Sequence, residues 1–190
     1  MRLFAAIELP EATLTVLHAF TAKLRNKSAG ATWVKPGNLH LTLRFYGEVS
    51  EKNATALSNC LTEHLAPLEA PELLARGVGA FPSIRKPSIL WVGIETLSGD
   101  LSGLQCATEQ AALDTGLAPE TRPFHPHLTL ARLRKGADAS LYANLLRPYL
   151  EPGLAPEFGP AFRADKITLF SSLLTQRGPI YTIVREITLK

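Results

Sequence analysis

The sequence predicts an α+β fold of two pseudo-symmetric lobes, each a mainly antiparallel sheet with flanking helices, with a cleft between the lobes. Three observations support this prediction. Strand-like and helix-like segments interleave, and several strands follow one another as hairpin-like pairs. The tetrapeptide His-Leu-Thr-Leu occurs twice, at 40–43 and at 127–130. The 190 residues are 46% hydrophobic and 19% charged, as in globular proteins, so we expect one bilobal domain over residues 1–190.

The spacing of apolar residues divides the chain into helices and strands. Apolar residues three and four apart predict helices over 10–27, 50–65, 98–113 and 139–150. Short β-rich runs bounded by glycine and proline predict strands over 2–8, 39–49, 73–81, 88–95, 127–133, 166–174 and 180–189. Clusters of turn-forming residues predict turns or loops at 28–32, 36–38, 82–87, 117–126, 151–160 and 176–179.

The composition argues against several classes of protein. The two cysteines, Cys60 and Cys106, form no Cys-x-x-Cys pair, which argues against a disulfide scaffold and a cysteine-rich zinc site. No stretch approaches the roughly 20 apolar residues of a membrane span, and the first residues do not resemble a signal peptide. We therefore expect a cytoplasmic protein with no membrane partner. The net charge of +3 is a mild indication of a polyanionic partner.

The two copies of the tetrapeptide are expected to present the same pair of side chains. Each copy lies in a predicted strand, where successive side chains point to opposite faces. His40 and Thr42 therefore share one face, and His127 and Thr129 share the corresponding face of the second copy. The leucines between them point into the core. If the lobes pack face to face, two histidines and two threonines converge in the cleft.

Two histidines that face each other can carry out acid–base catalysis on a phosphodiester. Imidazole titrates near pH ~6.5, so near neutrality one ring can accept a proton from water and the other can donate one to a leaving oxygen. Each transfer is typically worth ~10²–10⁴-fold in rate. Threonine hydroxyls can hydrogen-bond the non-bridging phosphoryl oxygens. This scheme needs neither a metal nor another cofactor.

The residues around both motifs resemble those of a known family. Residues 33–49, WVKPGNLHLTLRFYGEV, and residues 123–132, PFHPHLTLAR, are similar to the two motif regions of the bacterial and archaeal RNA 2′,3′-cyclic phosphodiesterases. This group, also called 2′-5′ RNA ligase-like, is part of the 2H phosphoesterases. Residues 2–7 and the segment 178–181, GPIY, are similar as well, so the resemblance covers nearly the whole chain.

The resemblance implies a fold, a reaction and a division of roles. It implies a bilobal α+β fold whose cleft binds RNA ending in a 2′,3′-cyclic phosphate and hydrolyses that end to a 2′-phosphate. It also implies that His40 is the proton donor and that His127 is the proton acceptor. The near symmetry of the two motifs does not fix that order independently.

Three further polar residues are candidates for binding the substrate. Arg44 has the strand parity to share the face of His40 and Thr42, although a place at the cleft rim is equally compatible with the sequence. Arg132 can bind a phosphate through two hydrogen bonds. By parity, however, Arg132 points away from the cleft unless a bulge re-aims it, and a structural ion pair is the alternative. His125 is expected to contact the substrate or to lie at the cleft edge.

The sequence leaves other functions open. His125 and His127, with His40 as a third ligand, could hold zinc in a metallohydrolase, but no nearby Asp, Glu or Cys completes the set. The cleft could also act on small cyclic nucleotides, join RNA ends through a 2′-5′ bond, or bind RNA without turnover. A pure binding module has no chemical need for two proton-transfer groups. We expect a monomer, because the two lobes of one chain supply both halves of the site.

Overall fold

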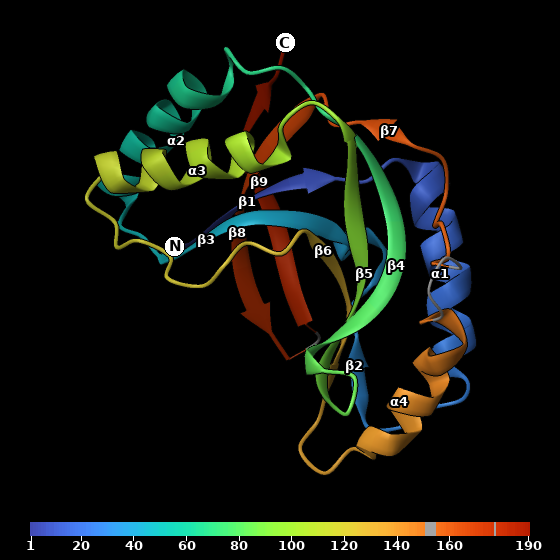
Figure 1. Ribbon diagram of the computed structural model, residues 1–190. Coiled ribbons are helices and arrows are strands. Elements are labelled where there is room, and N and C mark those ends of the chain that lie inside the picture. The colour runs from blue at the N-terminus through green and yellow to red at the C-terminus, as the bar shows by residue number, and fades with distance from the viewer. Residues whose placement is uncertain (151–154, 177) are drawn as a thin grey trace.

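The computed structural model of the protein describes residues 1–150, 155–176 and 178–190 and contains one continuous curled sheet (Figure 1). Its strands are β1 (Arg2–Glu8), β2 (Ala31–Trp33), β3 (His40–Glu48), β4 (Glu72–Ser83), β5 (Lys86–Ser98), β6 (His127–Leu133), β7 (Phe162–Arg163), β8 (Lys166–Thr175) and β9 (Gly178–Thr188). They lie in the order β7-β4-β5-β6-β3-β1-β8-β9, with β2 paired to β6. Every pairing between these strands is antiparallel. The predicted α+β fold with antiparallel sheet is therefore confirmed.

The two halves of the chain meet where β3 pairs with β6. On one side of this junction the sheet continues through β1, β8 and β9, and on the other through β5, β4 and β7. At the junction Leu41 of β3 pairs with Leu128 of β6, and both side chains are fully buried. The two predicted lobes are thus the two halves of a single sheet.

The helices are α1 (Glu11–Arg25), α2 (Glu51–Leu65), α3 (Leu101–Asp114) and α4 (Ala139–Leu146). The side chains of Ser50, Asp100 and Asp138 cap α2, α3 and α4 by accepting hydrogen bonds from backbone N–H groups of the first turn. These caps satisfy donors that a helix start leaves without a partner. In Figure 1, α2 and α3 lie together beside one half of the sheet, and α1 and α4 lie beside the other.

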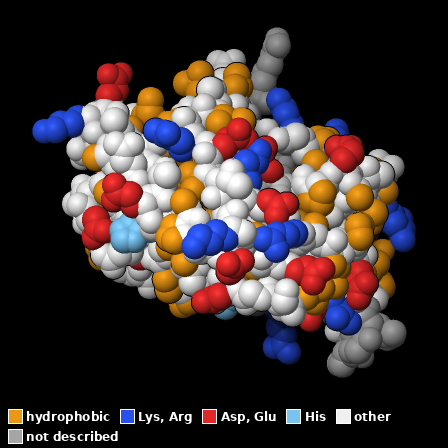
Figure 2. All heavy atoms as spheres, turned by 90° about the horizontal axis from the view of Figure 1, so that it is seen from above, with side chains coloured by type: hydrophobic (Ala, Val, Ile, Leu, Met, Phe, Trp, Pro, Cys, Tyr) orange, Lys and Arg blue, Asp and Glu red, His pale blue; other side chains and the backbone are white. Residues whose placement is uncertain are grey.

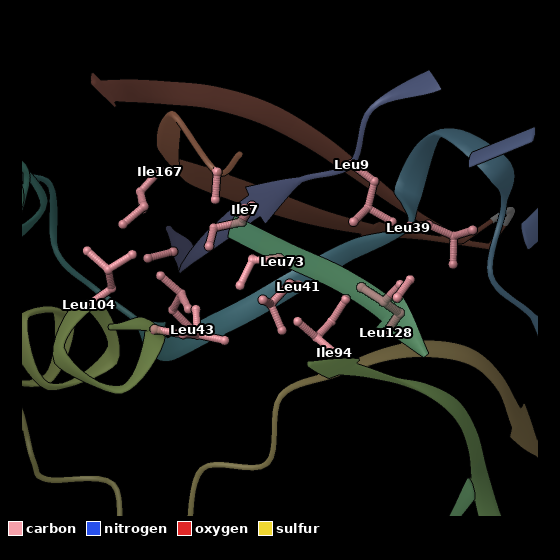
Figure 3. Close-up of a cluster of buried hydrophobic side chains, with 14 of the residues drawn as sticks. Ile7, Leu9, Leu39, Leu41, Leu43, Leu73, Ile94, Leu104, Leu128 and Ile167 are labelled. Atoms are coloured by element: carbon pink, nitrogen blue, oxygen red, sulfur yellow. The ribbon is translucent and has the colours of Figure 1, made fainter. Parts of the chain in front are cut away.

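Two apolar clusters occupy the two faces of the sheet. The main core lies between the sheet and the helices, and Figure 3 shows Leu41 and Leu128 within it, together with Leu104 of α3. Along β1 the residues of this core alternate with Phe4 and Ala6, which belong to a second, smaller cluster. Alternation along a strand places that second cluster on the opposite, open face of the sheet.

Several boundaries differ from the sequence-based expectation. β2 overlaps the end of the predicted loop at 28–32 and extends to Trp33, because its residues pair with 131–133 of β6. The helix expected over 139–150 ends as an α-helix at Leu146 and continues as a 3₁₀ turn, Arg147–Tyr149, because Pro148 lacks the N–H that an α-helix requires. β7 was not anticipated. Residues 151–154 and 177, in two of the predicted connections, lie outside the described residues.

Charged side chains are distributed rather than concentrated on the face of the molecule seen from above. Figure 2 shows Lys and Arg side chains interspersed there with Asp and Glu. Within the described ranges, no helix is long and apolar enough to cross a membrane.

Candidate active site

The central pair of strands brings His40 and His127 together. Leu41 and Leu128 are register partners in β3 and β6. Because these strands are antiparallel, His40 lies beside Thr129 and Thr42 lies beside His127, all on the face opposite the buried leucines. The two imidazoles are close enough that charge on His127 lowers the pKa of His40. The four residues of the repeated motif therefore meet on the open face of the sheet.

The same kind of hydrogen bond fixes both imidazoles. Nδ1 of His40 lies 2.8 Å from the carbonyl oxygen of Asn38, and Nδ1 of His127 lies 2.6 Å from the carbonyl oxygen of His125. A carbonyl can only accept, so Nδ1 carries the proton in each neutral ring and Nε2 carries the lone pair. Nε2 is therefore the atom through which each histidine can accept or donate a proton.

Aromatic side chains enclose each imidazole. His40 stacks on Phe4, with the ring centroids 4.9 Å apart, and meets Tyr181 edge-on at 5.4 Å. His127 meets Phe81 edge-on at 5.0 Å. Burial lowers the pKa of His40 from 6.5 to about 4, and burial also lowers the pKa of His127. An apolar surrounding disfavours the cation, so both rings are neutral at pH 7 in the free protein.

The charged neighbours of the two histidines differ in sign. Glu8 is the register partner of His40 across β1 and β3, and its carboxylate raises the pKa of His40 against the effect of burial. Arg132 and His125 instead add to the effect of burial and lower the pKa of His127 further. The site is therefore symmetric in its motif and asymmetric in its electrostatics.

A bulge in each central strand changes which residues face the cleft. The register shifts at Leu43 in β3, where it pairs with β1, and at Leu130 in β6, where it pairs with β5. A bulge reverses the alternation of side chains beyond it. The bulges thereby return to the open face the residue that lies five positions after each histidine. This residue is Phe45 in β3 and Arg132 in β6. The charge of Arg132 accordingly reaches His127.

The expected position of Arg44 on the face of His40 is wrong, because the bulge in β3 turns this side chain toward the helices. Arg44 is buried, and its Nε lies 2.6 Å from a carboxylate oxygen of Glu109 on α3. It also donates a hydrogen bond of 2.6 Å to the carbonyl oxygen of Ala118 and lies 3.6 Å from Glu120. Arg44 therefore links β3 to α3 and to the loop before β6. Its side chain does not reach the two histidines.

An open hollow of about 510 Å³ lies beside His127. Its walls include Phe81, Trp91 and His125. A water molecule occupies about 30 Å³ in the liquid, so the hollow has room for part of a nucleotide. Among the described residues no three His, Cys, Asp or Glu side chains gather as metal ligands. The three-histidine zinc set considered from the sequence is therefore not assembled.

Sequence reasoning did not assign a role to several side chains around the histidines. Phe4 and Tyr181 lie in the two terminal segments that are similar to the family, and that similarity was the available signal. Nothing in the sequence marks Glu8 as a residue of the site, because only the pairing of β1 with β3 places it beside His40. Phe81 reaches His127 across the hairpin of β4 and β5 in the same way.

Comparisons with known proteins agree with this fold and this repeat. A family model described as LigT-like phosphoesterase matches the chain twice, over residues 7–91 and 92–181. The RNA 2′,3′-cyclic phosphodiesterase of Aquifex aeolicus (strain VF5) is 35% identical over 156 residues, which cover 81% of this chain and 79% of that protein. The protein of the same name from Methanothermobacter thermautotrophicus is 31% identical over 182 residues, covering 96% and 95%. The crystal structure of E. coli LigT complexed with 3′-AMP matches with a TM-score of 0.75 at 27% identity, over 100% of this chain and 98% of that one. Each half of the chain thus carries the family's pattern once, and the protein belongs to the LigT-like family of 2H phosphoesterases.

Proposed function

We propose that this protein hydrolyses the terminal 2′,3′-cyclic phosphodiester of RNA to a 2′-phosphomonoester by acid–base catalysis with two histidines and no metal. The observation that carries the proposal is the matched pair of imidazoles on adjacent strands, each fixed through Nδ1 to a backbone carbonyl. Both relatives described above are named RNA 2′,3′-cyclic phosphodiesterase. The E. coli LigT structure holds an adenosine monophosphate, which is a ligand of related chemistry.

In the proposed reaction, water attacks phosphorus from the side of His127 and the ribose 3′-oxygen leaves on the side of His40. Nε2 of His127 takes a proton from the water as the new P–O bond forms. Nε2 of His40 gives its proton to the 3′-oxygen as the bond from phosphorus to that oxygen breaks. The phosphate stays on the 2′-oxygen. The two histidines then exchange protons with solvent and regain their starting forms.

The remaining polar groups of the cleft are proposed to hold the substrate. Hydroxyl donors from Thr42 and Thr129, one beside each histidine, suit the non-bridging oxygens that carry negative charge in the transition state. The guanidinium of Arg132, which the bulge returns to this face, suits the same oxygens. His125, in the wall of the hollow, is proposed to contact the nucleoside.

The charges around the histidines support His40 as the donor and His127 as the acceptor. A donor has to start protonated and an acceptor has to start neutral. Glu8 favours the cationic form of His40, whereas Arg132 and His125 favour the neutral form of His127. Burial opposes protonation of His40 in the free protein, and the negative charge of a bound phosphodiester acts with Glu8 to restore it.

The value of kcat/KM is expected to be highest below pH 6.5. The reactive form needs cationic His40 and neutral His127, and the pKa values of both lie below 6.5, that of His40 at about 4. The maximum lies between the two pKa values, and the rate falls at higher pH as His40 loses its proton. In Glu8→Gln the carboxylate charge that raises the pKa of His40 is gone, so kcat/KM at pH 7 should fall. A pH–rate profile of both proteins checks this; a maximum on the alkaline side of pH 7, or equal activity of the variant at pH 7, would contradict it.

Gly79→Ala is expected to disturb the wall of the hollow. Gly79 pairs with Trp91 across β4 and β5, and a Cβ at Gly79 would lie 2.2 Å from the indole. The indole has to move, and because displacements near 1 Å can cost about 100-fold in rate, we expect kcat/KM to fall by about 10-fold or more. Gly37→Ala is the matched control, since a Cβ there meets nothing within 4 Å. Tryptophan fluorescence and steady-state kinetics report the change; a variant equal to wild type in both would show that the indole does not shape the substrate site.

The proposed activity is tested on an oligoribonucleotide that ends in a 2′,3′-cyclic phosphate, with EDTA present and the product identified. Turnover to a 2′-phosphate is the expected result. Turnover of a small 2′,3′-cyclic nucleotide but not of the oligonucleotide would keep the chemistry and change the substrate. Activity that EDTA abolishes would contradict the metal-independent mechanism. A 3′-phosphate product would mean that the ribose 2′-oxygen leaves, and not the 3′-oxygen as proposed.

We also propose that a single chain is the working unit and that it acts in the cytoplasm. Strands β3 and β6 of one chain supply both histidines, so the site needs no second copy. Cys60 and Cys106 are free thiols, which suits a reducing compartment. Specific activity should therefore stay constant when the protein is diluted, and a loss of specific activity on dilution would contradict the monomer.

A further inference from the structure

Strands β1 and β9 each place an aromatic ring against His40. Phe4, near the N-terminus, stacks on the imidazole of His40, and Tyr181, near the C-terminus, meets the same ring edge-on. Phe4 and Tyr181 also contact each other, with ring centroids 4.9 Å apart. The two terminal segments, which the proposed mechanism does not use, therefore build one wall of the site.

The position of Tyr181 is linked to that of His40 through Asn38. The side-chain amide of Asn38 donates a hydrogen bond of 3.1 Å to the carbonyl oxygen of Pro179, two residues before Tyr181. The backbone carbonyl of Asn38 holds Nδ1 of His40. One residue thus fixes the start of β9 and the orientation of the imidazole, so the Tyr181 ring has a defined place relative to Nε2 of His40.

The hydroxyl of Tyr181 is a donor with no hydrogen-bond partner among the described residues, although its ring is half-buried against other aromatic rings. Burial raises the pKa of Tyr181 above its ordinary value of 10.0, so the phenol keeps its proton near neutral pH. The positive charges of Arg132 and Arg2 oppose this effect of burial and favour the ionised phenol. Arg132 comes from β6 and Tyr181 from β9, so they approach the histidines from different halves of the sheet.

We infer that Tyr181 is a substrate-contacting residue whose hydroxyl donates a hydrogen bond to a non-bridging oxygen of the phosphoryl group held beside His40. This inference rests on the proposed function and adds a donor that the His-x-Thr motifs do not contain. Arg132 and Tyr181 would then hold the phosphoryl oxygens from the two halves of the sheet. An anion placed between the two groups supplies the acceptor that the phenol lacks within the protein.

Tyr181→Phe removes the hydroxyl and keeps the ring against His40. Loss of a hydrogen bond to a charged group should lower kcat/KM on the 2′,3′-cyclic phosphate by about 10- to 100-fold. The thermal unfolding midpoint and the shape of the pH–rate profile should match those of wild type, because His40 keeps its aromatic surroundings. Tyr149→Phe makes the same chemical change at a tyrosine that packs on Phe20, outside the site, and should leave kcat/KM unchanged.

Tyr181→Leu removes the aromatic ring as well as the hydroxyl, so comparing it with Tyr181→Phe distinguishes the role of the hydroxyl from that of the ring. This variant also opens the surroundings of His40 to water, so its pH–rate profile should shift toward higher pH in addition to the loss of activity. If Tyr181→Phe is as active as wild type and only Tyr181→Leu is impaired, the residue acts through ring packing and the inference is overturned. Calorimetric titration with 2′-AMP makes the test independent of turnover: weaker binding by Tyr181→Phe than by wild type supports the contact even if the cyclic phosphate is not a substrate. Equal binding by both proteins, or failure of wild type to bind 2′-AMP, overturns the contact, whereas turnover of the 2′,3′-cyclic phosphate by wild type decides the proposed function separately.

Discussion

Replacement of either His40 or His127 by alanine should lower kcat on a 2′,3′-cyclic phosphate by about 10²–10⁴-fold, the typical worth of one positioned proton-transfer group. Alanine removes the Nε2 atom that exchanges the proton and leaves the strand in place. Both imidazoles lie on the open face of the sheet and not in the main core, so each variant should keep the wild-type circular dichroism. Steady-state kinetics measure the loss.

In the double variant, the fold-losses in kcat caused by the two histidine substitutions should not multiply. Both groups act on the same transition state, and residues that act as a unit lose nearly all of their effect when one of them is removed. His64→Ala is the matched control, because His64 on α2 binds Asp114 at 2.7 Å, away from the cleft, and should leave kcat unchanged. Full activity of either His40→Ala or His127→Ala would refute the two-histidine mechanism, and multiplicative losses would show that the histidines act in separate steps.

Leu128→Ala should lower the free energy of unfolding by about 2–5 kcal/mol, the range for truncating a fully buried leucine. Leu128 has no exposed surface and pairs with Leu41 at the junction of the two halves. Both leucines belong to the main core, and close packing there leaves the cavity made by the missing atoms little room to collapse. Urea denaturation followed by circular dichroism measures the change.

The control for Leu128→Ala is Leu97→Ala, because 45% of Leu97 is exposed and its truncation removes little buried surface. Surface substitutions of this kind usually stay within about 0.5 kcal/mol. Leu41→Ala should behave like Leu128→Ala, and the two together should show a coupling energy of about 0.5–3 kcal/mol because the side chains are neighbours. Equal stability of Leu128→Ala and Leu97→Ala would mean that the junction is not the rigid centre of the fold.

Much of the fold and the centre of the site can be predicted from the sequence because both depend on local patterns. Alternation along each strand separates His40 and Thr42 from the buried Leu41, and the repeated tetrapeptide does the same in β6. Proline, glycine and apolar spacing locate most helices and strands. The short strands β2 and β7 escape such patterns, since they exist only through their pairing with β6 and β4.

The sequence could not place the two arginines because bulges are set by the pairing of neighbouring strands. Simple parity puts Arg44 in the cleft and Arg132 outside it, and the bulges exchange these positions. The structure also shows why burial is tolerated at Arg44, whose charge is paired with Glu109. Tertiary pairing likewise decides that Glu8 lies beside His40, which no spacing within the sequence reveals.

A crystal structure of the protein with 2′-AMP bound would test the two-histidine site most directly. We predict that the phosphate lies between the imidazoles, with Nε2 of His40 and Nε2 of His127 each about 2.6–3.2 Å from one of its oxygens. The hydroxyls of Thr42 and Thr129 should contact other oxygens of the same phosphate. A phosphate that contacts only one histidine, or that lies in the hollow away from both, would contradict the proposal that the two halves of the sheet act together on one phosphodiester.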